Sequence, residues 1–347
     1  MNPRRAHLVA ALVAAAALVA CHSSSGSGGS TPPTTAPGRA STLYLSGAQV
    51  PGYLVSLIAA SNGSAAPLTA IRSTYANFAY TYLLAYHSGS LWATSCLGLA
   101  NTAGPVLAFS ATANGPSVTP SVAIAGAATG LSGCQLGIAV DSSQNVYVAD
   151  PTSTATFPGG QIAVFGSGQQ GNVAPIRRIF GTAANLHSPA GLALDGSGNL
   201  FVANSGEGSA GYAGAIEIFS TGANGNAVPG GTIIGGSTGL SEPFGVAFDS
   251  LGNLYVTNVA ADSITVYAPG ARGNATPIRT ISGSNTQLNS PTGIAVDGAG
   301  YVYVGNESQP NSPVLVFAPS SNGNASPVQA ITVNAGGFDE PSGVALK

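Results

Sequence analysis

Four polar residues recur along the sequence at a spacing that could place them around one site. Asp150, Asn204, Asn258 and Asn306 each end an apolar segment, and they are 54, 54 and 48 residues apart. Carboxylate and amide oxygens bind hard cations such as Ca²⁺ or Mg²⁺, or the polar groups of a ligand. Asn and Asp side chains also cap loop backbone. Because only one of the four is charged, the sequence favours capping and predicts no cofactor, with a single Ca²⁺ or Mg²⁺ as the alternative.

The histidines form no pattern for zinc binding or nucleophilic catalysis. His7 and His22 precede the folded part, while His87 and His187 align with opposite ends of the repeat described below. No Ser–His or Cys–His arrangement is evident. We therefore assign no catalytic residues and no metal ligands.

Two aromatic residues are further candidates for ligand contact. Phe157 and Tyr212 occur in neighbouring copies of the repeat described below, in the longest loops between its second and third strands. Exposed aromatic rings could stack on a sugar or anchor a partner, or they could pack beneath their own loops. Both interpretations stay open.

Two cysteines align with the same end of adjacent repeats. Cys96 follows a second strand and Cys134 precedes a first strand. A disulfide between them suits an oxidising compartment. The alternative is two separate thiols, because alignment does not show that their Cα atoms lie within about 7 Å. We predict the disulfide.

An internal repeat of about fifty residues positions all these side chains. Its first strand has the pattern Gly-Ile-Ala-Val-Asp, in the segments 137–141, 191–195, 245–249 and 293–297. A second strand follows each, in the segments 146–150, 200–204, 254–258 and 302–306. A third strand comes next, and a Gly-Asn turn and a proline introduce a fourth. Four strands in such a unit are typical of a propeller blade.

The turns between first and second strands support this interpretation. In Asp195-Gly-Ser-Gly198 the carboxylate can bond to the backbone two residues on, and Gly198 suits a left-handed conformation. One repeat differs, because Gln144 occupies the glycine position.

The two chain ends are predicted to share one blade. A weaker copy of the repeat lies upstream, and before it come only three strands, at 43–45, 54–58 and 68–71. The C-terminal segment 343–346 matches a first strand and completes the N-terminal blade. Residues 42–347 then divide into six units of 51 residues. We predict an all-β, six-bladed propeller over residues 41–347, with four antiparallel strands per blade.

The repeat resembles the NHL-repeat propellers, and it is also similar to the gluconolactonase-like and streptogramin-lyase-like six-bladed propellers. The resemblance covers nearly all of residues 41–347, although the Asn-His-Leu tripeptide of the NHL family is absent. It implies that first strands line a central channel. It also implies that the loops from strand two to three and from strand four to the next blade lie on one face, here named the upper face, where ligands bind.

The N-terminus is typical of an export signal. Arg4 and Arg5 precede an apolar run, Leu8 to Ala20, that is shorter than the roughly twenty residues of a membrane-spanning helix. The run ends in Leu18-Val-Ala-Cys21, which resembles the lipobox of bacterial lipoproteins, in which the cysteine is acylated and becomes the first residue. The alternative is a plain signal peptide with an incidental cysteine.

The segment after the signal peptide predicts a tether. Residues 21–40 are rich in Ser, Gly, Pro and Thr, a composition typical of flexible linkers. The resemblance to lipoproteins implies export and a lipid anchor in the cell envelope. His22 stands where Asp is associated with inner-membrane retention, which favours the outer membrane if the organism has one.

The amino-acid composition excludes one class of binding partner. Charged residues make up only 6% of the chain, with nine Lys and Arg against twelve Asp and Glu. This is too few cations for a nucleic-acid-binding face. We predict a monomeric, membrane-tethered module that binds an envelope protein, peptide or carbohydrate. The alternative is a divalent-metal-dependent lactonase-like or lyase-like enzyme.

Overall fold

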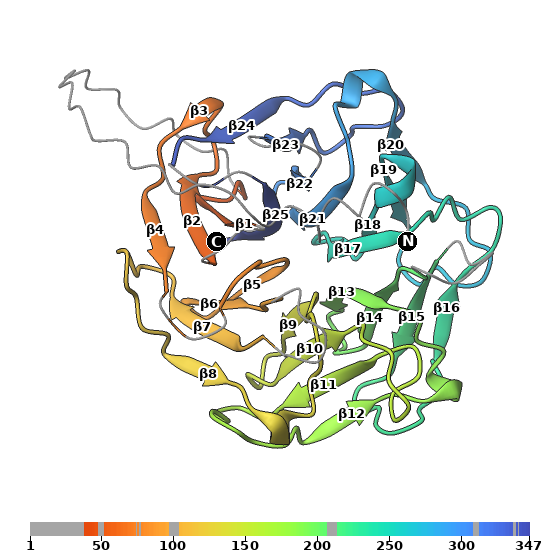
Figure 1. The fold of residues 1–347 in the computed structure, drawn as a ribbon. Coiled ribbons are helices and arrows are strands. Elements are labelled where there is room, and N and C mark those ends of the chain that lie inside the picture. Colours follow the sequence, from red (N-terminus) through yellow and green to blue (C-terminus); the bar gives the residue numbers. More distant parts are fainter. Residues whose placement is uncertain are drawn as a thin grey trace, which may run out of the picture.

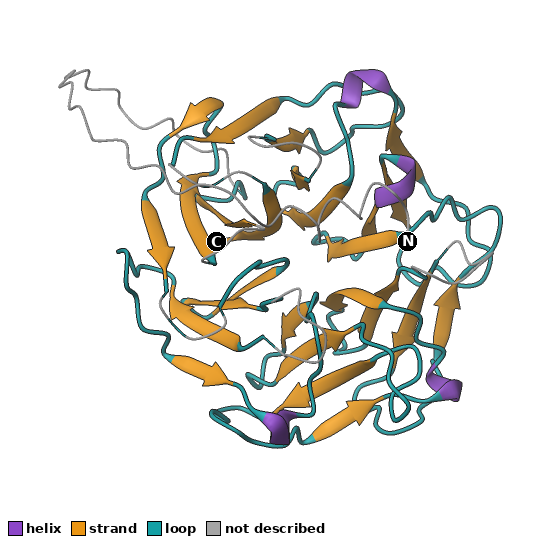
Figure 2. Cartoon of the chain, viewed as in Figure 1, coloured by secondary structure: helices purple, strands orange, loops and turns teal. Residues whose placement is uncertain are grey.

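The alternation of apolar strands and turns produces six antiparallel sheets of four consecutive blade strands, arranged around a central axis (Figure 1). The computed structural model describes residues 38–347 except 48–51, 74, 76–77, 97–103, 207–213, 308–311, 336–337 and 339. Cys21, the tether before Gly38, and Tyr212 lie outside the described residues. Within these residues the only helices are four short 3-10 turns (Figure 2). The predicted all-β, six-bladed propeller is confirmed.

Each blade runs from an inner first strand to an outer fourth strand. Blade one contains β25 (Pro341–Leu346), β1 (Thr42–Gly47), β2 (Tyr53–Ile58) and β4 (Thr69–Arg72). Blade two contains β5 (Leu84–His87), β6 (Ser90–Ala93), β7 (Val106–Ser110) and β8 (Val122–Ile124). Blade three contains β9 (Ile138–Val140), β10 (Val146–Asp150), β11 (Gln161–Phe165) and β12 (Arg177–Ile179).

The other three blades follow the same order. Blade four contains β13 (Pro189–Leu194), β14 (Leu200–Asn204), β15 (Ala215–Phe219) and β16 (Gly231–Ile233). Blade five contains β17 (Pro243–Phe248), β18 (Leu254–Asn258), β19 (Ser263–Tyr267) and β20 (Arg279–Ser282). Blade six contains β21 (Pro291–Val296), β22 (Val302–Asn306), β23 (Val314–Phe317) and β24 (Gln329–Val333). The 3-10 turns are Ala127–Thr129, Thr182–Ala184, Val259–Ala261 and Ser284–Thr286.

The C-terminal strand closes the ring as predicted. β25 pairs antiparallel with β1, with Leu346 opposite Leu43 and Val344 opposite Leu45 (Figure 1). The backbone N–H of Ser41 also donates to the carbonyl of Lys347, over 3.0 Å. Because the first and the last described strands pair in one sheet, blade one has no unpaired strand where the ring closes.

Each blade also hydrogen-bonds to its neighbour through the loop between the third and fourth strands. In blade four, Gly225 pairs parallel with Ile179 of blade three, and in blade five Gly273 pairs with Ile233. The same bridge recurs around the ring, and between blades six and one it extends to a short strand, β3 (Gly63–Ala65), beside β24. The Gly-Asn turn of the repeat is therefore an inter-blade contact as well as a turn.

Asparagines beside these glycines strengthen the inter-blade contact. Asn226 Oδ1 accepts from the backbone N–H of Ala183 over 2.7 Å, and Asn274 Oδ1 accepts from Ser237 over the same distance. These bonds satisfy loop N–H groups that no strand partner reaches.

The turns between first and second strands behave as their sequence predicts. Asp195 Oδ1 accepts from the backbone N–H groups of Ser197 and Asn199, both over 2.9 Å. Gly198 has φ +79°, and Gln144 adopts φ +65° at the equivalent position. Blade three therefore keeps the turn and places a side chain in the left-handed conformation.

Most of the apolar core lies between neighbouring blades. One cluster joins Tyr147 and Ile162 of blade three to Val202 and Phe219 of blade four, and equivalent clusters recur around the ring. Because each blade buries its faces against the next, no blade forms a complete core alone.

Candidate functional site: the upper face and axis of the ring

The ends of the strands define two faces of the ring. Second and fourth strands end at the upper face, whereas first and third strands end at the opposite, lower face. Among the described residues, the upper face holds the candidate residues Asp150, Asn204, Asn258 and Asn306 at the ends of β10, β14, β18 and β22.

All four of these side chains are buried and bonded to the loop that precedes the first strand of their own blade. In each blade the backbone N–H of one loop residue donates to the Oδ atom of the capping side chain. The pairs are Ser132 to Asp150, His187 to Asn204, Ser241 to Asn258 and Asn289 to Asn306. These distances are 2.7, 2.6, 3.1 and 2.7 Å. The side chains are at most 4% exposed. The contacts are those of loop caps, which shape the upper loops from beneath.

The amide groups complete the cap in two blades. Asn204 Nδ2 donates to the carbonyl of Asn185 over 2.7 Å, and Asn306 Nδ2 donates to that of Gln287 over 2.9 Å. An amide suits this position because it accepts and donates at once.

Asp150 replaces the amide in blade three and changes the surrounding bonds. Its carboxylate accepts from Ser132, from Thr152 N–H over 3.1 Å and from Gln161 Nε2 over 3.1 Å. Burial raises the pKa of Asp150, and these hydrogen bonds oppose the shift. Arg178 lies in the same network, where it bonds Gln161 and the carbonyl of Gly130. Burial lowers the Arg178 pKa, and the charge on Asp150 opposes that shift.

Glu217 is a second buried carboxylate beneath the upper face, and sequence analysis did not identify it. It is fully buried on β15, where Thr232 Oγ1 donates to Oε2 over 2.6 Å and Asn185 Nδ2 donates to Oε1 over 2.7 Å. Burial raises the Glu217 pKa, and these two bonds and the charge of His187 oppose the shift. The equivalent strand position is alanine in blade three and threonine in blade five, so the repeat gave no signal for a carboxylate.

Phe157 is half-buried and packs at the upper face of blade three. Its ring lies edge-on to Phe180, with centroids 5.2 Å apart, and the Arg178 guanidinium is 5.3 Å from its centroid. The ring therefore packs against residues of the fourth strand of its own blade and of the segment just after it, with part of the ring exposed. The histidines are apart as expected, with His87 at the lower end of β5 and His187 in an upper loop.

Cys96 and Cys134 lie beside each other at the upper face. Their Cα atoms are 4.1 Å apart and their sulfur atoms are bonded as a disulfide. Cys96 N–H also donates to the carbonyls of Ala79 and Tyr80, over 3.1 and 3.2 Å. The disulfide therefore joins the loop that enters blade three to the loop after β6 of blade two, which in turn contacts the loop that enters blade two.

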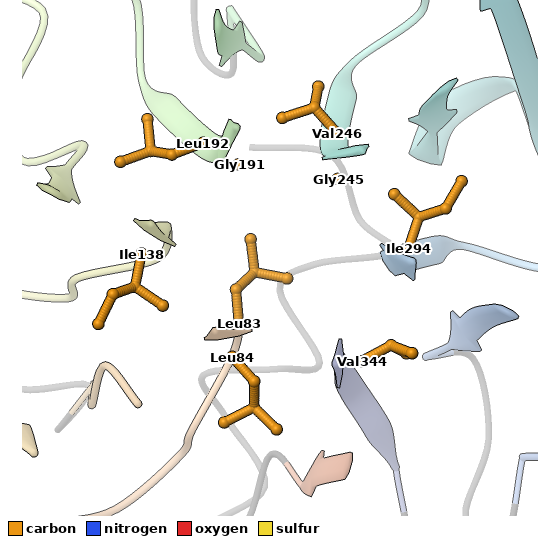
Figure 3. A pocket seen from close by; sticks show the side chains of 9 residues that line it. All are labelled: Leu83, Leu84, Ile138, Gly191, Leu192, Gly245, Val246, Ile294 and Val344. Carbon is orange, nitrogen blue, oxygen red and sulfur yellow. The ribbon is translucent and has the colours of Figure 1, made fainter. Parts of the chain in front are cut away.

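Aliphatic side chains line and narrow the axis of the ring (Figure 3). One residue from each first strand lines it, and these are Leu84, Ile138, Leu192, Val246, Ile294 and Val344. Between them the remaining cavity measures only about 30 Å³, which is the space of a single water.

Leu83 narrows the axis further (Figure 3). It stands at the position of the motif glycine, which the other five blades keep as Gly137, Gly191, Gly245, Gly293 and Gly343. Its side chain projects between the other axial residues (Figure 3). On the upper side it packs with Ala190, Phe244 and Val259, and half-buried Tyr82 and Leu136 flank the cluster. These side chains form an apolar cluster at the upper end of the axis, beside the buried hydroxyls of Thr292 and Ser342.

Two further findings concern metal ions and membrane spanning. Within the described part of the chain, no three His, Cys, Asp or Glu side chains gather as a possible metal site. No helix among those residues is long and apolar enough to span a bilayer.

The comparisons with known proteins identify the fold. A scan against protein-family models finds no match, and a search of curated proteins finds none. The chain is similar to a protein of unknown function from Bacteroides caccae, at TM-score 0.59 and 10% identity, over 88% of this chain and 98% of that one. It is also similar to U3-55K, at TM-score 0.51 and 10% identity, over 84% and 78%. These identities show the fold alone, and they do not show membership of the NHL-repeat family.

Proposed function

We propose that this chain is a lipid-anchored binding module of the cell envelope, which presents the upper face of its propeller to a protein or peptide. The lipobox-like segment ending at Cys21 and the tether after it support the anchor. The propeller supports the binding role, because its loops are held by caps and a disulfide on a rigid ring.

The narrowness of the axis is the observation that carries the binding role. Pockets for small molecules usually enclose roughly 300–1,000 Å³, whereas the axial cavity here is about 30 Å³. Leu83 and Phe244 give the mouth a floor of packed side chains. A surface of this kind suits contact with an extended partner more than enclosure of a small substrate.

The same observation ranks the binding module above the lactonase-like or lyase-like alternative. Such an enzyme would place oxygen ligands for a divalent ion at the upper mouth of the channel. The cluster of Leu83, Phe244, Ala190 and Leu136 at this mouth supplies no such ligands. The hydroxyls of Thr292 and Ser342, at the equivalent positions of blades six and one, donate to the carbonyls of Ser342 and Glu340.

Site-specific photo-cross-linking in intact cells tests the binding role. A photoreactive phenylalanine analogue replaces Tyr82, beside the upper mouth, and in a control it replaces Leu251 in a lower turn. We expect a discrete protein cross-link from position 82 and none from position 251. Cross-links from neither position, or from 251 alone, would contradict the proposal.

Mass analysis of the N-terminal peptide tests the anchor separately. We expect a peptide that begins at Cys21 and carries acyl chains, and Cys21→Ser should move the protein out of the membrane fraction. An unacylated peptide in a membrane-free fraction would refute the anchor.

A further inference from the structure

We propose that the lower face of the ring is the membrane-facing surface, which rests against anionic phospholipid headgroups and points the upper face away from the bilayer. The lower face is the side where first and third strands end. The orientation rests on the anchor at Cys21 in the proposed function. Three features of the described residues support it, and the second and third of them do not depend on the anchor.

The first feature is the place where the N-terminal segment meets the ring. Gly38 packs against Gly298 in the lower turn of blade six, and Ala40 N–H donates to Asp297 Oδ2 over 3.3 Å. Arg39 lies 3.7 Å from the same carboxylate and donates to Gln329 Oε1 over 2.7 Å. The chain that leads back to Cys21 therefore leaves from the lower face, so an anchor there draws this face toward the bilayer.

The second feature is the distribution of exposed aliphatic side chains. Seven of the eight large hydrophobic side chains exposed among the described residues lie at the lower end of the ring, and these are Ile58, Leu68, Ile176, Val228, Leu251, Ile278 and Val328. The eighth, Ile234, follows β16 at the upper end. Leu251 is 78% exposed at a turn tip. Such residues contact the boundary between headgroups and acyl chains in proteins that lie on membranes.

The arrangement of these residues favours a bilayer over a compact protein partner. Leu68, Ile176, Ile278 and Val328 occupy one repeat position, directly before the fourth strand in blades one, three, five and six. They are therefore spread around the perimeter and do not form one patch. A flat surface as wide as the ring can contact all of them together, whereas a protein interface normally gathers its apolar residues at the centre.

The third feature is charge. The lower half of the described ring carries five cations, Arg39, Arg177, Arg272, Arg279 and Lys347, against the four turn carboxylates Asp141, Asp195, Asp249 and Asp297. The upper half carries two, Arg72 and Arg178, against Asp150, Glu217, Glu242, Asp262, Glu307 and Glu340. With every side chain counted in its ordinary ionised form, the net side-chain charges are therefore 5 − 4 = +1 and 2 − 6 = −4. An anionic bilayer repels the upper half and accepts the lower half.

Tryptophan quenching by brominated lipid tests the orientation. The chain from Cys21 onward, which keeps every described residue, is coupled through the Cys21 thiol to a maleimide phospholipid in vesicles of phosphatidylcholine and phosphatidylglycerol. Leu251→Trp reports on the lower face, and Ile234→Trp, a matched exposed aliphatic at the upper end, is the control. Trp92 gives both variants the same background.

We expect brominated lipid to quench the Leu251→Trp signal about threefold more than the Ile234→Trp signal, because interfacial residues lie within about 5–10 Å of the headgroup boundary. The difference should shrink in pure phosphatidylcholine and at high salt. Equal quenching of both variants, stronger quenching at position 234, or no quenching in coupled protein would overturn the proposal. Because the coupling is chemical, these outcomes do not depend on whether cells acylate Cys21.

Discussion

Arg39 and Asp297 form an ion pair, with Nε 3.7 Å from the carboxylate, between the N-terminal segment and blade six. The guanidinium also stacks 3.7 Å from the ring centroid of Tyr301. In blades three and five an arginine of the fourth strand takes the role that Arg39 has in blade six. Arg177 donates to the hydroxyl of Tyr147, and Arg279 donates to the hydroxyl of Tyr255. Blade six has Gln329 at that position, and Arg39 supplies the missing guanidinium from another part of the chain.

Arg39→Ala should lower the free energy of unfolding by about 2 kcal/mol, because it leaves the buried Asp297 carboxylate without its cation and removes the stacking on Tyr301. Arg39→Lys should recover little, since an ammonium neither stacks nor bonds in a planar fork. Adding Gln329→Arg to Arg39→Ala should restore most of the loss. Urea unfolding measures all three, with the exposed Lys347→Ala as a neutral control. A double variant no more stable than Arg39→Ala would contradict this relationship.

Removal of the disulfide should destabilise the protein by about 4 kcal/mol, the chain-entropy value for a sequence separation of 38 residues. Cys96→Ser with Cys134→Ser should therefore unfold at a clearly lower denaturant concentration. Thiol titration of the unfolded, non-reduced chain provides the direct check. It should detect no reactive cysteine beyond Cys21, and two additional thiols would reject the bond.

Glu217→Gln should change how stability depends on pH. Burial raises the Glu217 pKa above the ordinary value of 4.5. Between pH 4.5 and the raised pKa, the folded protein therefore binds a proton that the unfolded chain has lost. This proton's contribution to the free energy of unfolding is fully present below pH 4.5 and is lost as the pH rises through the raised pKa. Glutamine stays neutral and can still bond Asn185 and Thr232. The difference in free energy of unfolding between the variant and the wild type should therefore shift in favour of the variant when the pH is raised from 4 to 8.

Urea unfolding at a series of pH values measures this effect. Glu217→Ala is the comparison variant, because it empties the site and leaves Asn185 and Thr232 without their acceptor. It should be less stable than Glu217→Gln at every pH. The same slope in Glu217→Gln and the wild type would show that this carboxyl does not cause the pH dependence.

Gly191→Ala should destabilise the ring by about 3 kcal/mol or more, since overpacking against fixed backbone forces neighbouring strands apart. A Cβ at Gly191 would collide with the carbonyl oxygen of Phe244 on the next blade. Gly196→Ala is the matched control, because a Cβ there meets no atom within 4 Å. Its effect should stay within about 0.5 kcal/mol. Thermal unfolding compares the two, and equal midpoints would refute the role of close strand approach at the axis.

The sequence by itself determined the blade count, the strand order and the closure of the ring. These depend on local patterns, because alternating apolar residues form strands and an Asp followed by Gly forms the turn wherever the unit recurs. The motif from Gly191 to Asp195 therefore gave its strand and its turn correctly, and the match of residues 343–346 to that motif was enough to pair β25 with β1.

Only the tertiary structure decided what happens where one repeat differs from the rest. Leu83 aligns with five glycines, but its effect depends on strands from all six blades converging on one axis. Glu217 aligns with an alanine and a threonine, and only the approach of Asn185 and Thr232 shows how a buried carboxylate is satisfied there. Arg39 replaces a side chain of β24, a strand 290 residues away in sequence. The contacts of Leu83 and Arg39 join residues far apart in the chain, whereas a periodic pattern reports on neighbours within one unit. Glu217 bonds within its own unit, but it is a departure from the repeat, and a periodic pattern carries no information about a residue that does not recur.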